Sequence, residues 1–238
     1  MRIPLTVYGI PEILLFTALF GGAAAAALLG LDAPVGPVAA GLGIGSWLFI
    51  INFFRDPNRQ LPDGEALIVA PADGKVTDII QVDDVPFVDG PAIRIGIFLS
   101  VFDVHVNKSP VTGRVAYQKH RPGGYLDARD PACADLNEAH DLGLLVADGT
   151  GGTFPVLVRQ IAGLVARRIV CRAKDGQELA AGERYGMIKV GSRTEVYVPV
   201  DRLAETTVKV GTMVKGGRDL IGRLRVSTPT EVPEGARS

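Results

Sequence analysis

The sequence predicts a mainly β domain preceded by a helical hairpin that spans a membrane. One observation behind this prediction is a pair of long uncharged segments near the N-terminus. Another is the change, from about Leu61 onward, to short alternating segments separated by Gly, Pro and Asp. Hydrophobic residues make up 47% of the 238 residues, which is enough for one sizeable core in addition to the apolar N-terminus.

The two uncharged segments are each long enough to cross a bilayer as a helix. Residues 13–31 and residues 33–54 contain no charged side chain, and Asp32 alone separates them. Turn-forming residues at positions 30–37 predict a tight connection between two antiparallel helices. We therefore predict a membrane anchor over residues 1–56.

The charges that flank the hairpin predict its orientation. Arg2 precedes the first segment, and Arg55 and Arg59 follow the second. The positive-inside rule therefore places both ends, and the domain over residues 57–238, on the cytoplasmic side of the cell membrane. Two alternatives are a cleaved signal peptide in place of the first span and an interfacial or buried first segment, since Ala and Gly dilute its hydrophobicity.

The rest of the chain predicts strands rather than long helices, because apolar residues alternate over short stretches. Candidate strands are residues 66–70, 92–99, 113–119, 153–160, 166–172, 187–190, 195–200 and 220–226. Predicted turns are Asp73-Gly74, Asp89-Gly90, Asp175-Gly176 and Gly216-Gly217, and residues 122–141 form a predicted long loop. The pattern predicts a β-rich α+β fold that is barrel- or sandwich-like, with lipoyl-like features.

Composition argues against several classes of function. The formal net charge is −1 and no dense run of Lys or Arg occurs, which argues against a nucleic-acid surface. Cys133 and Cys171 lack the CxxC spacing of a metal or redox site, so no metal site is predicted. No GxxxxGK[ST] phosphate loop occurs either. A membrane-related substrate fits the sequence better.

The Gly191-Ser192 bond lies between two strand-like stretches and is the candidate for self-cleavage. Glycine lets a neighbouring hydroxyl approach its carbonyl closely, and Ser192 supplies that hydroxyl. His105, in an apolar stretch, and Asp73, after a predicted strand, are candidates for the base and for the carboxylate that orients it. Each also has an ordinary interpretation. The Gly-Ser pair can be a simple turn, His105 a hydrogen-bonded core residue, and Asp73 part of a hairpin turn.

Three ordered blocks of the chain resemble the phosphatidylserine decarboxylase family. The blocks are Pro-Ala-Asp-Gly-Lys-Val at residues 71–76, residues 100–113 around His105, and residues 182–199 around the Gly-Ser pair. The resemblance extends over residues 53–228 and is greatest to the short, membrane-anchored prokaryotic form.

The resemblance implies a proenzyme that cuts itself into a β chain of residues 1–191 and an α chain of residues 192–238. His105, oriented by Asp73, would deprotonate Ser192, which would attack the Gly191 carbonyl and become a covalent pyruvoyl group. That group would form a Schiff base with phosphatidylserine in the membrane, and phosphatidylethanolamine would be released after loss of carbon dioxide. No exogenous cofactor is implied.

The chain departs from the family pattern at two positions. Phe102 stands where the family often has a second histidine. The proton donor of the decarboxylation step would then be His105 or a group of the loop at residues 122–141, such as His140. Ala139 follows Asn137-Glu138 where related sequences have arginine, which predicts a structural or peripheral role for this pair. Three basic residues belong either to a solvated strand face or to a site for the headgroup phosphate: Arg184, Lys189 and Arg193.

Two other functions are open from the sequence. A membrane-bound serine hydrolase would keep Ser192 as a lasting nucleophile, with His105 and Asp73 as its partners, and would remain one chain. A non-catalytic, membrane-tethered β module resembling lipoyl-type carrier domains would tolerate Ser192→Ala. The hydrocarbon backbone of the lipid and the formation of a homo-oligomer are not determined by the sequence.

Overall fold

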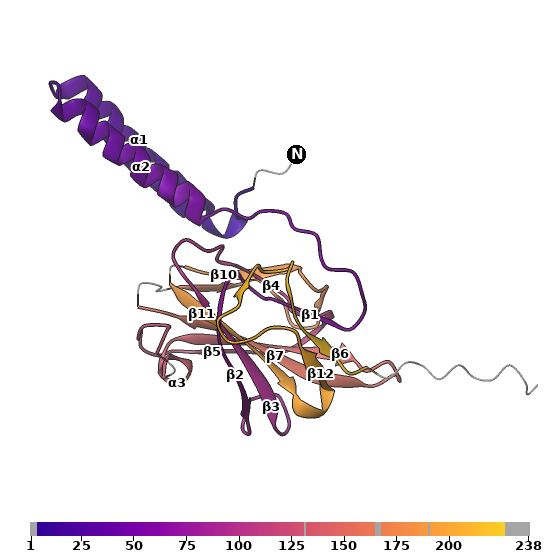
Figure 1. Cartoon of the computed structure of the whole chain (residues 1–238). Helices are drawn as coiled ribbons and strands as arrows, with labels where there is room; N and C mark the ends of the chain where they lie inside the picture. The colour runs from indigo at the N-terminus through magenta and orange to yellow at the C-terminus, as the bar shows by residue number, and fades with distance from the viewer. Residues whose placement is uncertain (1–3, 131, 165–167, 190, 227–238) are drawn as a thin grey trace, which may run out of the picture.

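The computed structural model describes residues 4–130, 132–164, 168–189 and 191–226. A pair of helices stands at one end of a β domain (Figure 1). The short 3-10 helix η1 (Val7–Gly9) leads into α1 (Ile10–Gly30), and α2 (Val35–Phe53) packs along α1. Both long helices have the length and composition needed to cross a membrane, in agreement with the predicted hairpin.

The base of the hairpin is seated on the β domain. Phe53 and Phe54 are buried in one cluster with Met187, although they come at the end of an apolar helix. Lys189 forms an ion pair with Glu12 in the first turn of α1. The hairpin is therefore attached to the domain by packing and by charge, close to the segment that leads to Ser192.

The β domain is built from short strands. Their bounds are β1 (Leu67–Val69), β2 (Gly74–Val82), β3 (Ala92–Leu99), β4 (Val106–Lys108), β5 (Gly113–Arg121), β6 (Ala139–Ala147), β7 (Thr153–Ala162), β8 (Ile169–Cys171), β9 (Glu178–Leu179), β10 (Arg184–Ile188), β11 (Ser192–Pro199), β12 (Leu203–Thr206), β13 (Met213–Val214) and β14 (Leu220–Leu224). A second 3-10 helix, η2 (Val200–Arg202), joins β11 to β12. The predicted mainly β fold is confirmed.

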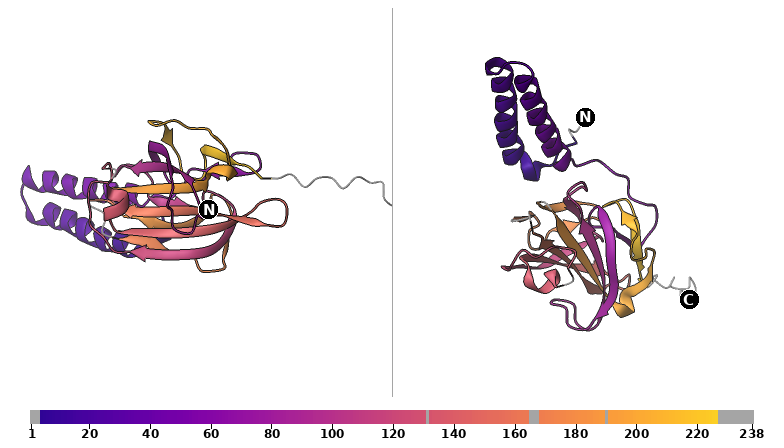
Figure 2. Two further views of the ribbon diagram at one scale, coloured as in Figure 1. Left: turned by 90° about the horizontal axis from the view of Figure 1, so that it is seen from below. Right: turned by 60° about the vertical axis from the view of Figure 1, so that its left-hand side comes forward.

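The strands form antiparallel sheets that enclose one core. The largest sheet has the order β13-β2-β3-β11-β7-β6-β5-β9 and curls around the core (Figures 1 and 2). Two smaller sheets, in the orders β4-β10-β8 and β1-β14-β12, lie over its concave side. The strand β11 has β3 on one side and β7 on the other along its length, so it is a central strand.

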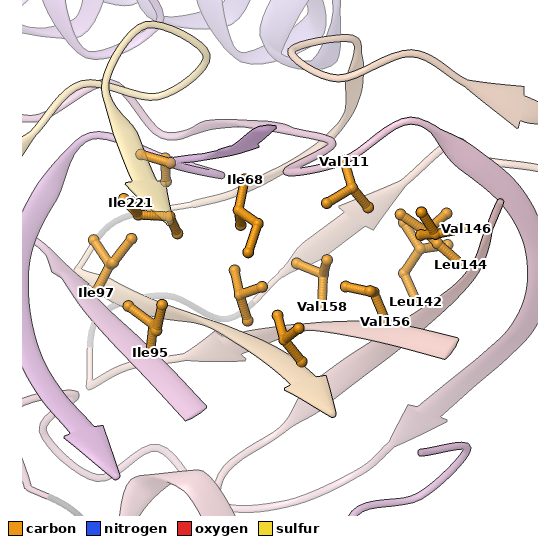
Figure 3. Packing of buried hydrophobic residues seen from close by; sticks show 14 of the residues in the cluster. Ile68, Ile95, Ile97, Val111, Leu142, Leu144, Val146, Val156, Val158 and Ile221 are labelled. Atoms are coloured by element: carbon orange, nitrogen blue, oxygen red, sulfur yellow. The ribbon is translucent and has the colours of Figure 1, made fainter. Parts of the chain in front are cut away.

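The core lies on the inward face of the large sheet (Figure 3). Val196 and Val198 of β11 belong to this core together with Ile97 of β3. Because side chains alternate along a strand, Ser192 and Thr194 lie on the same inward face as Val196 and Val198. The candidate nucleophile is therefore directed toward the interior, between the sheets.

Some predicted boundaries were wrong where charged residues lie inside the sheet. β11 begins at Ser192 rather than at residue 195, since Arg193 is buried and pairs with Glu195 and with Asp78 of β2. β2 was not predicted, and Gly74, assigned to a turn, is its first residue. The sequence placed these charged residues in turns or at solvated positions. In the structure they are neutralised by partners on neighbouring strands.

The predicted loop at residues 122–141 ends earlier than expected. It contains the single-turn helix α3 (Cys133–Leu136), and β6 begins at Ala139. Asp141 favoured a loop in the sequence, yet it is buried in β6, where its Oδ1 accepts a hydrogen bond from Nε of Arg159 on β7 at 2.6 Å. The predicted strand at residues 92–99 coincides with β3. The other predicted strands correspond to β1, β5, β7, β8, β10 and β14 with shifted ends.

Parts of several predictions lie outside the described residues. These are Arg2, used for the orientation of the hairpin, residues 166–167 of one predicted strand, Val190 of another, and the C-terminal tail.

Candidate functional site

The Gly191-Ser192 bond lies where the chain passes from one sheet to another. β10 ends at Ile188 in the sheet β4-β10-β8, and β11 begins at Ser192 in the large sheet. Gly191 has a φ of +59°, a conformation that favours glycine. Ser192 is fully buried, in register with Leu99 of β3 and Ala162 of β7. Among the described residues its Oγ has no hydrogen-bond partner, which is costly for a buried hydroxyl and suggests a chemical role.

The carbonyl group of Gly191 packs against Gly163, the residue that follows β7. A Cβ atom at position 163 would collide with the carbonyl oxygen of Gly191 and would lie 3.2 Å from the Cβ of Ala128. Glycine at position 163 therefore leaves the room in which the carbonyl of the candidate scissile bond sits. No local pattern indicates this role, because the two glycines are 28 positions apart in the chain.

His105 is buried with its basic nitrogen free. Its Nδ1 lies 2.9 Å from the carbonyl oxygen of Asp103, and since a carbonyl only accepts hydrogen bonds, Nδ1 carries the proton. Nε2 is then the unprotonated nitrogen, and it has no hydrogen-bond partner among the described residues. Burial lowers the pKa of His105 from 6.5 to about 4, although the hydrogen bond to Asp103 opposes this shift. The ring is therefore neutral at pH 7.

The backbone ties His105 to the segment that precedes the junction. The amide of Ile188 donates a hydrogen bond to the carbonyl oxygen of His105 at 3.3 Å. The imidazole packs against the ring of Phe53 at a centroid distance of 4.5 Å. No hydrogen bond joins Nε2 of His105 to Oγ of Ser192 in the described structure. A base and a hydroxyl are thus both buried and unsatisfied near one strand crossing.

Asp73 does not orient His105 by the hydrogen bond that the sequence predicted. Its carboxylate forms a two-point ion pair with Arg59, with Nη2 at 2.8 Å from Oδ2, and accepts a hydrogen bond from the amide of Gly216 at 2.9 Å. Burial opposes ionisation of Asp73, but the contacts with Arg59 prevail and lower its pKa. Asp73 is therefore a buried anion that acts on His105 through its field. The orienting group is the carbonyl of Asp103.

A buried amide network, not recognised in the sequence, joins the two sheets beside the junction. Nδ2 of Asn107 donates to Oγ1 of Thr194 at 3.2 Å, and Nε2 of Gln160 donates to Oδ1 of Asn107 at 2.8 Å. Asn107 lies two residues after His105, and Thr194 lies two residues after Ser192. The network therefore fixes the strands that carry the base and the hydroxyl relative to each other. The sequence signal that could have indicated this network is the presence of polar residues at inward positions of otherwise apolar strands.

Asn137 holds the 122–138 segment against the same end of the sheet. Its Oδ1 accepts from the amide of Leu126 at 2.8 Å, and its Nδ2 donates to the carbonyls of Leu126 and Ala162 at 2.9 and 2.7 Å. Ala162 is the register partner of Ser192 on β7. The partial Asn-Glu motif therefore has a structural role next to the junction.

Other candidate residues lie elsewhere. Phe102, at the position of the family's second histidine, is 67% exposed. His140 is in register with Gln160 of β7, so one strand separates it from Ser192 on β11. The three basic residues considered for the headgroup phosphate are all paired with carboxylates: Arg184 with Asp56, Lys189 with Glu12, and Arg193 with Asp78 and Glu195. A solvated strand face is therefore wrong for Arg193, which is 1% exposed.

Comparison with known proteins agrees with this architecture. A match to the family described as phosphatidylserine decarboxylase covers residues 47–222. A protein of Symbiobacterium thermophilum named phosphatidylserine decarboxylase proenzyme is 46% identical over 190 residues, which are 80% of this chain and 84% of the relative. A protein of the same name from Carboxydothermus hydrogenoformans is 43% identical over 179 residues, 75% of this chain and 81% of the relative.

A longer alignment covers nearly the whole chain. The phosphatidylserine decarboxylase proenzyme of Geotalea daltonii is 38% identical over 222 residues, which are 93% of this chain and 97% of that protein. The family match contains both Gly191 and Ser192, together with His105 and Asp73. The chain therefore belongs to the phosphatidylserine decarboxylase family.

Proposed function

We propose that this protein converts phosphatidylserine to phosphatidylethanolamine at a membrane, after it has cut its own backbone between Gly191 and Ser192. The names of the relatives support both the substrate and the processing of a precursor. The observation that carries the proposal is a pair of buried, unsatisfied groups, Nε2 of His105 and Oγ of Ser192, near a glycine-serine bond at a sheet crossing. We further propose that the β domain lies on the cytoplasmic side, since Arg55 and Arg59 follow α2.

The proposed cleavage begins with proton transfer from Ser192 to His105. Nε2 takes the proton of Oγ, and Oγ attacks the carbonyl carbon of Gly191, while the proton on Nδ1 stays hydrogen-bonded to the carbonyl oxygen of Asp103. The C–N bond then breaks, the new amine takes the proton from Nε2, and an ester joins Gly191 to the side chain of residue 192. A base then removes the Cα proton of residue 192 as the Cβ–O bond breaks, which releases the Gly191 carboxylate and leaves a dehydroalanine. The dehydroalanine tautomerises to an imine, and addition of water with loss of ammonia gives the ketone.

Residue 192 is the position that would hold the resulting pyruvoyl group. A hydroxyl after a glycine, fully buried and near a neutral histidine, fits its formation. The group supplies a ketone that condenses with the primary amine of a serine headgroup and withdraws electrons as carbon dioxide leaves. Burial of residue 192 keeps bulk solvent away from the reacting atoms. His105 can hold or return a proton at Nε2.

The two fragments would remain one folded unit after the cut. The α chain begins with β11, which has β3 and β7 of the β chain on its two sides. It also contains β14, which pairs with β1. Backbone hydrogen bonds and core packing therefore hold the fragments together without the covalent bond.

The mass of the purified full-length protein tests this proposal. We expect two fragments that divide at residues 191 and 192, with the smaller one blocked at its N-terminus and labelled by hydroxylamine or borohydride. A folded, active protein that stays continuous and reacts with a fluorophosphonate would instead support the hydrolase interpretation.

Gly163→Ala is expected to slow self-cleavage by about 100-fold, because the added methyl group must displace the Gly191 carbonyl from its position. The measurement is the fraction of uncut chain with time after synthesis in a cell-free system. Gly41→Ala, at a helical position where the methyl group meets no neighbour within 4 Å, is the control and should cleave at the wild-type rate. Unchanged cleavage of Gly163→Ala would contradict the proposed tight seating of the carbonyl.

Asp73→Asn is expected to slow self-cleavage by about 10-fold, because the neutral amide no longer stabilises the positive charge that develops on His105. It should also lower the melting temperature, since Arg59 loses its buried partner. Asp141→Asn removes a comparable buried partner, that of Arg159. This control should lower the melting temperature while cleavage continues at the wild-type rate. Equal cleavage in both variants would restrict Asp73 to a structural role.

A further inference from the structure

The turn between β3 and β4 carries an exposed aromatic residue at the base of the hairpin. Phe102 lies in this turn and is 67% exposed. Its ring meets the ring of Phe49 in α2 edge to face, at a centroid distance of 6.1 Å and an interplanar angle of 84°. Nη2 of Arg55 donates to the carbonyl oxygen of Phe102 at 2.6 Å. The turn is therefore held against the end of α2, with its aromatic side chain still open to the surroundings.

The contact with Phe49 sets the level of the turn along the hairpin. Phe49 precedes Phe53, the last residue of α2, by four positions, which is ~6 Å along a helix. Phe49 is 42% exposed and belongs to the segment long and apolar enough to cross a membrane. Phe102 is therefore level with the last turn of that segment and does not lie below its end.

The polar groups of the turn are directed away from its tip. One carboxylate oxygen of Asp103, the acidic residue next to Phe102, accepts hydrogen bonds from the amide and the hydroxyl of Ser100, both at 2.9 Å. Asp103 is 8% exposed. Arg55 adds a positive charge at the same level, which suits the phosphates of anionic lipids. The accessible part of the turn is therefore an aromatic ring with a cation beside it, as is common at membrane interfaces.

We propose that the turn at residues 100–104 is a second membrane contact of this protein, in which Phe102 enters the interfacial layer of a phospholipid bilayer beside α2. The inference rests on the membrane anchor that forms part of the proposed function. It adds a contact made by the β domain itself. His105 follows this turn and packs on Phe53, so the contact would hold the buried imidazole directly under the lipid surface.

Fluorescence quenching in the full-length protein tests the proposal. Trp47 in α2 is the one tryptophan of the chain, so Trp47→Phe gives a silent background. Phe102→Trp in that background is reconstituted in phosphatidylglycerol-phosphatidylcholine vesicles whose acyl chains carry bromine near the headgroup end. Its tryptophan emission should fall by about half, as expected for an interfacial side chain. The matched control is Ile80→Trp in the same background. Ile80 is 43% exposed on β2, which runs away from the hairpin (Figure 1), and should show no quenching.

The native Trp47 separates failure of the proposal from failure of the anchor. Quenching of Trp47 together with unquenched Phe102→Trp would overturn the membrane contact of the turn while the anchor stands. Emission of Phe102→Trp that depends on the protein-to-lipid ratio and not on bromine would also overturn it, because a second copy of the chain would then cover Phe102. The readout requires neither self-cleavage nor decarboxylation, and circular dichroism of each variant verifies folding.

Discussion

Ser192→Ala is expected to yield a single uncut chain with no decarboxylase activity. Alanine removes the one atom that can attack the Gly191 carbonyl from the adjacent residue, so neither the ester nor the ketone can form. The loss should be complete in both assays, namely intact mass and release of carbon dioxide from phosphatidylserine in vesicles. Replacement of a fully buried serine by alanine removes an unsatisfied hydroxyl, so the fold should be retained or slightly stabilised.

Ser109→Ala is the matched control for this substitution. Ser109 is also fully buried, and its hydroxyl donates to the carbonyl oxygen of Val111 at 2.7 Å. Its variant should be cut at Gly191 and remain active. A Ser192→Ala protein that still divides at the junction, or that still releases carbon dioxide, would exclude the proposed origin of the catalytic ketone.

His105→Ala is expected to slow self-cleavage by about 10²- to 10⁴-fold, the usual contribution of a positioned general base. The reason is the loss of the free Nε2. No other base among the described residues is hydrogen-bonded to Oγ of Ser192 and could replace it. The rate is measured as conversion of the precursor to fragments after synthesis. His140→Ala should cleave at the wild-type rate, since β7 separates His140 from Ser192. Equal rates for the two variants would rule out His105 as the base.

The pH dependence of cleavage gives a second test of His105. Its pKa of about 4 means that the ring is neutral and can accept a proton at any pH well above 4. We expect a constant rate between about pH 5.5 and 8 and a fall below about pH 4.5, as the ring becomes protonated. An ordinary histidine would give a fall near its usual pKa of 6.5 instead.

The same shift has a consequence for stability. The unfolded chain takes up a proton on His105 near pH 6.5, whereas the folded chain takes it up only near pH 4. The contribution of His105 to the free energy of unfolding is therefore fully present above pH 6.5 and decreases as the pH falls toward 4. In the uncut Ser192→Ala background, His105→Gln should reduce the loss of stability between pH 7 and pH 5 on denaturant unfolding.

The elements predicted well are those whose pattern is continuous in the chain. The hairpin and the strands β3, β5 and β7 were found because a long apolar run or a regular alternation marks each of them. β2, β4, β6, β9, β12 and β13 were not predicted. β2 contains the charged residues Lys75 and Asp78, and Asp141 lies near the start of β6. Those charges are satisfied by residues far away in sequence, such as Arg193 for Asp78 and Arg159 for Asp141.

The sequence by itself determined which bond is a candidate for cleavage and which atom attacks it, because Ser192 and the carbonyl of Gly191 are adjacent along the chain. It also indicated His105, through the block that surrounds it. Only the tertiary structure decided how that histidine is prepared. The Asp103 carbonyl sets its tautomer, burial against Phe53 lowers its pKa, and Gly163 makes room for the scissile carbonyl. These properties depend on desolvation and on contacts between distant segments, neither of which is written in local sequence patterns.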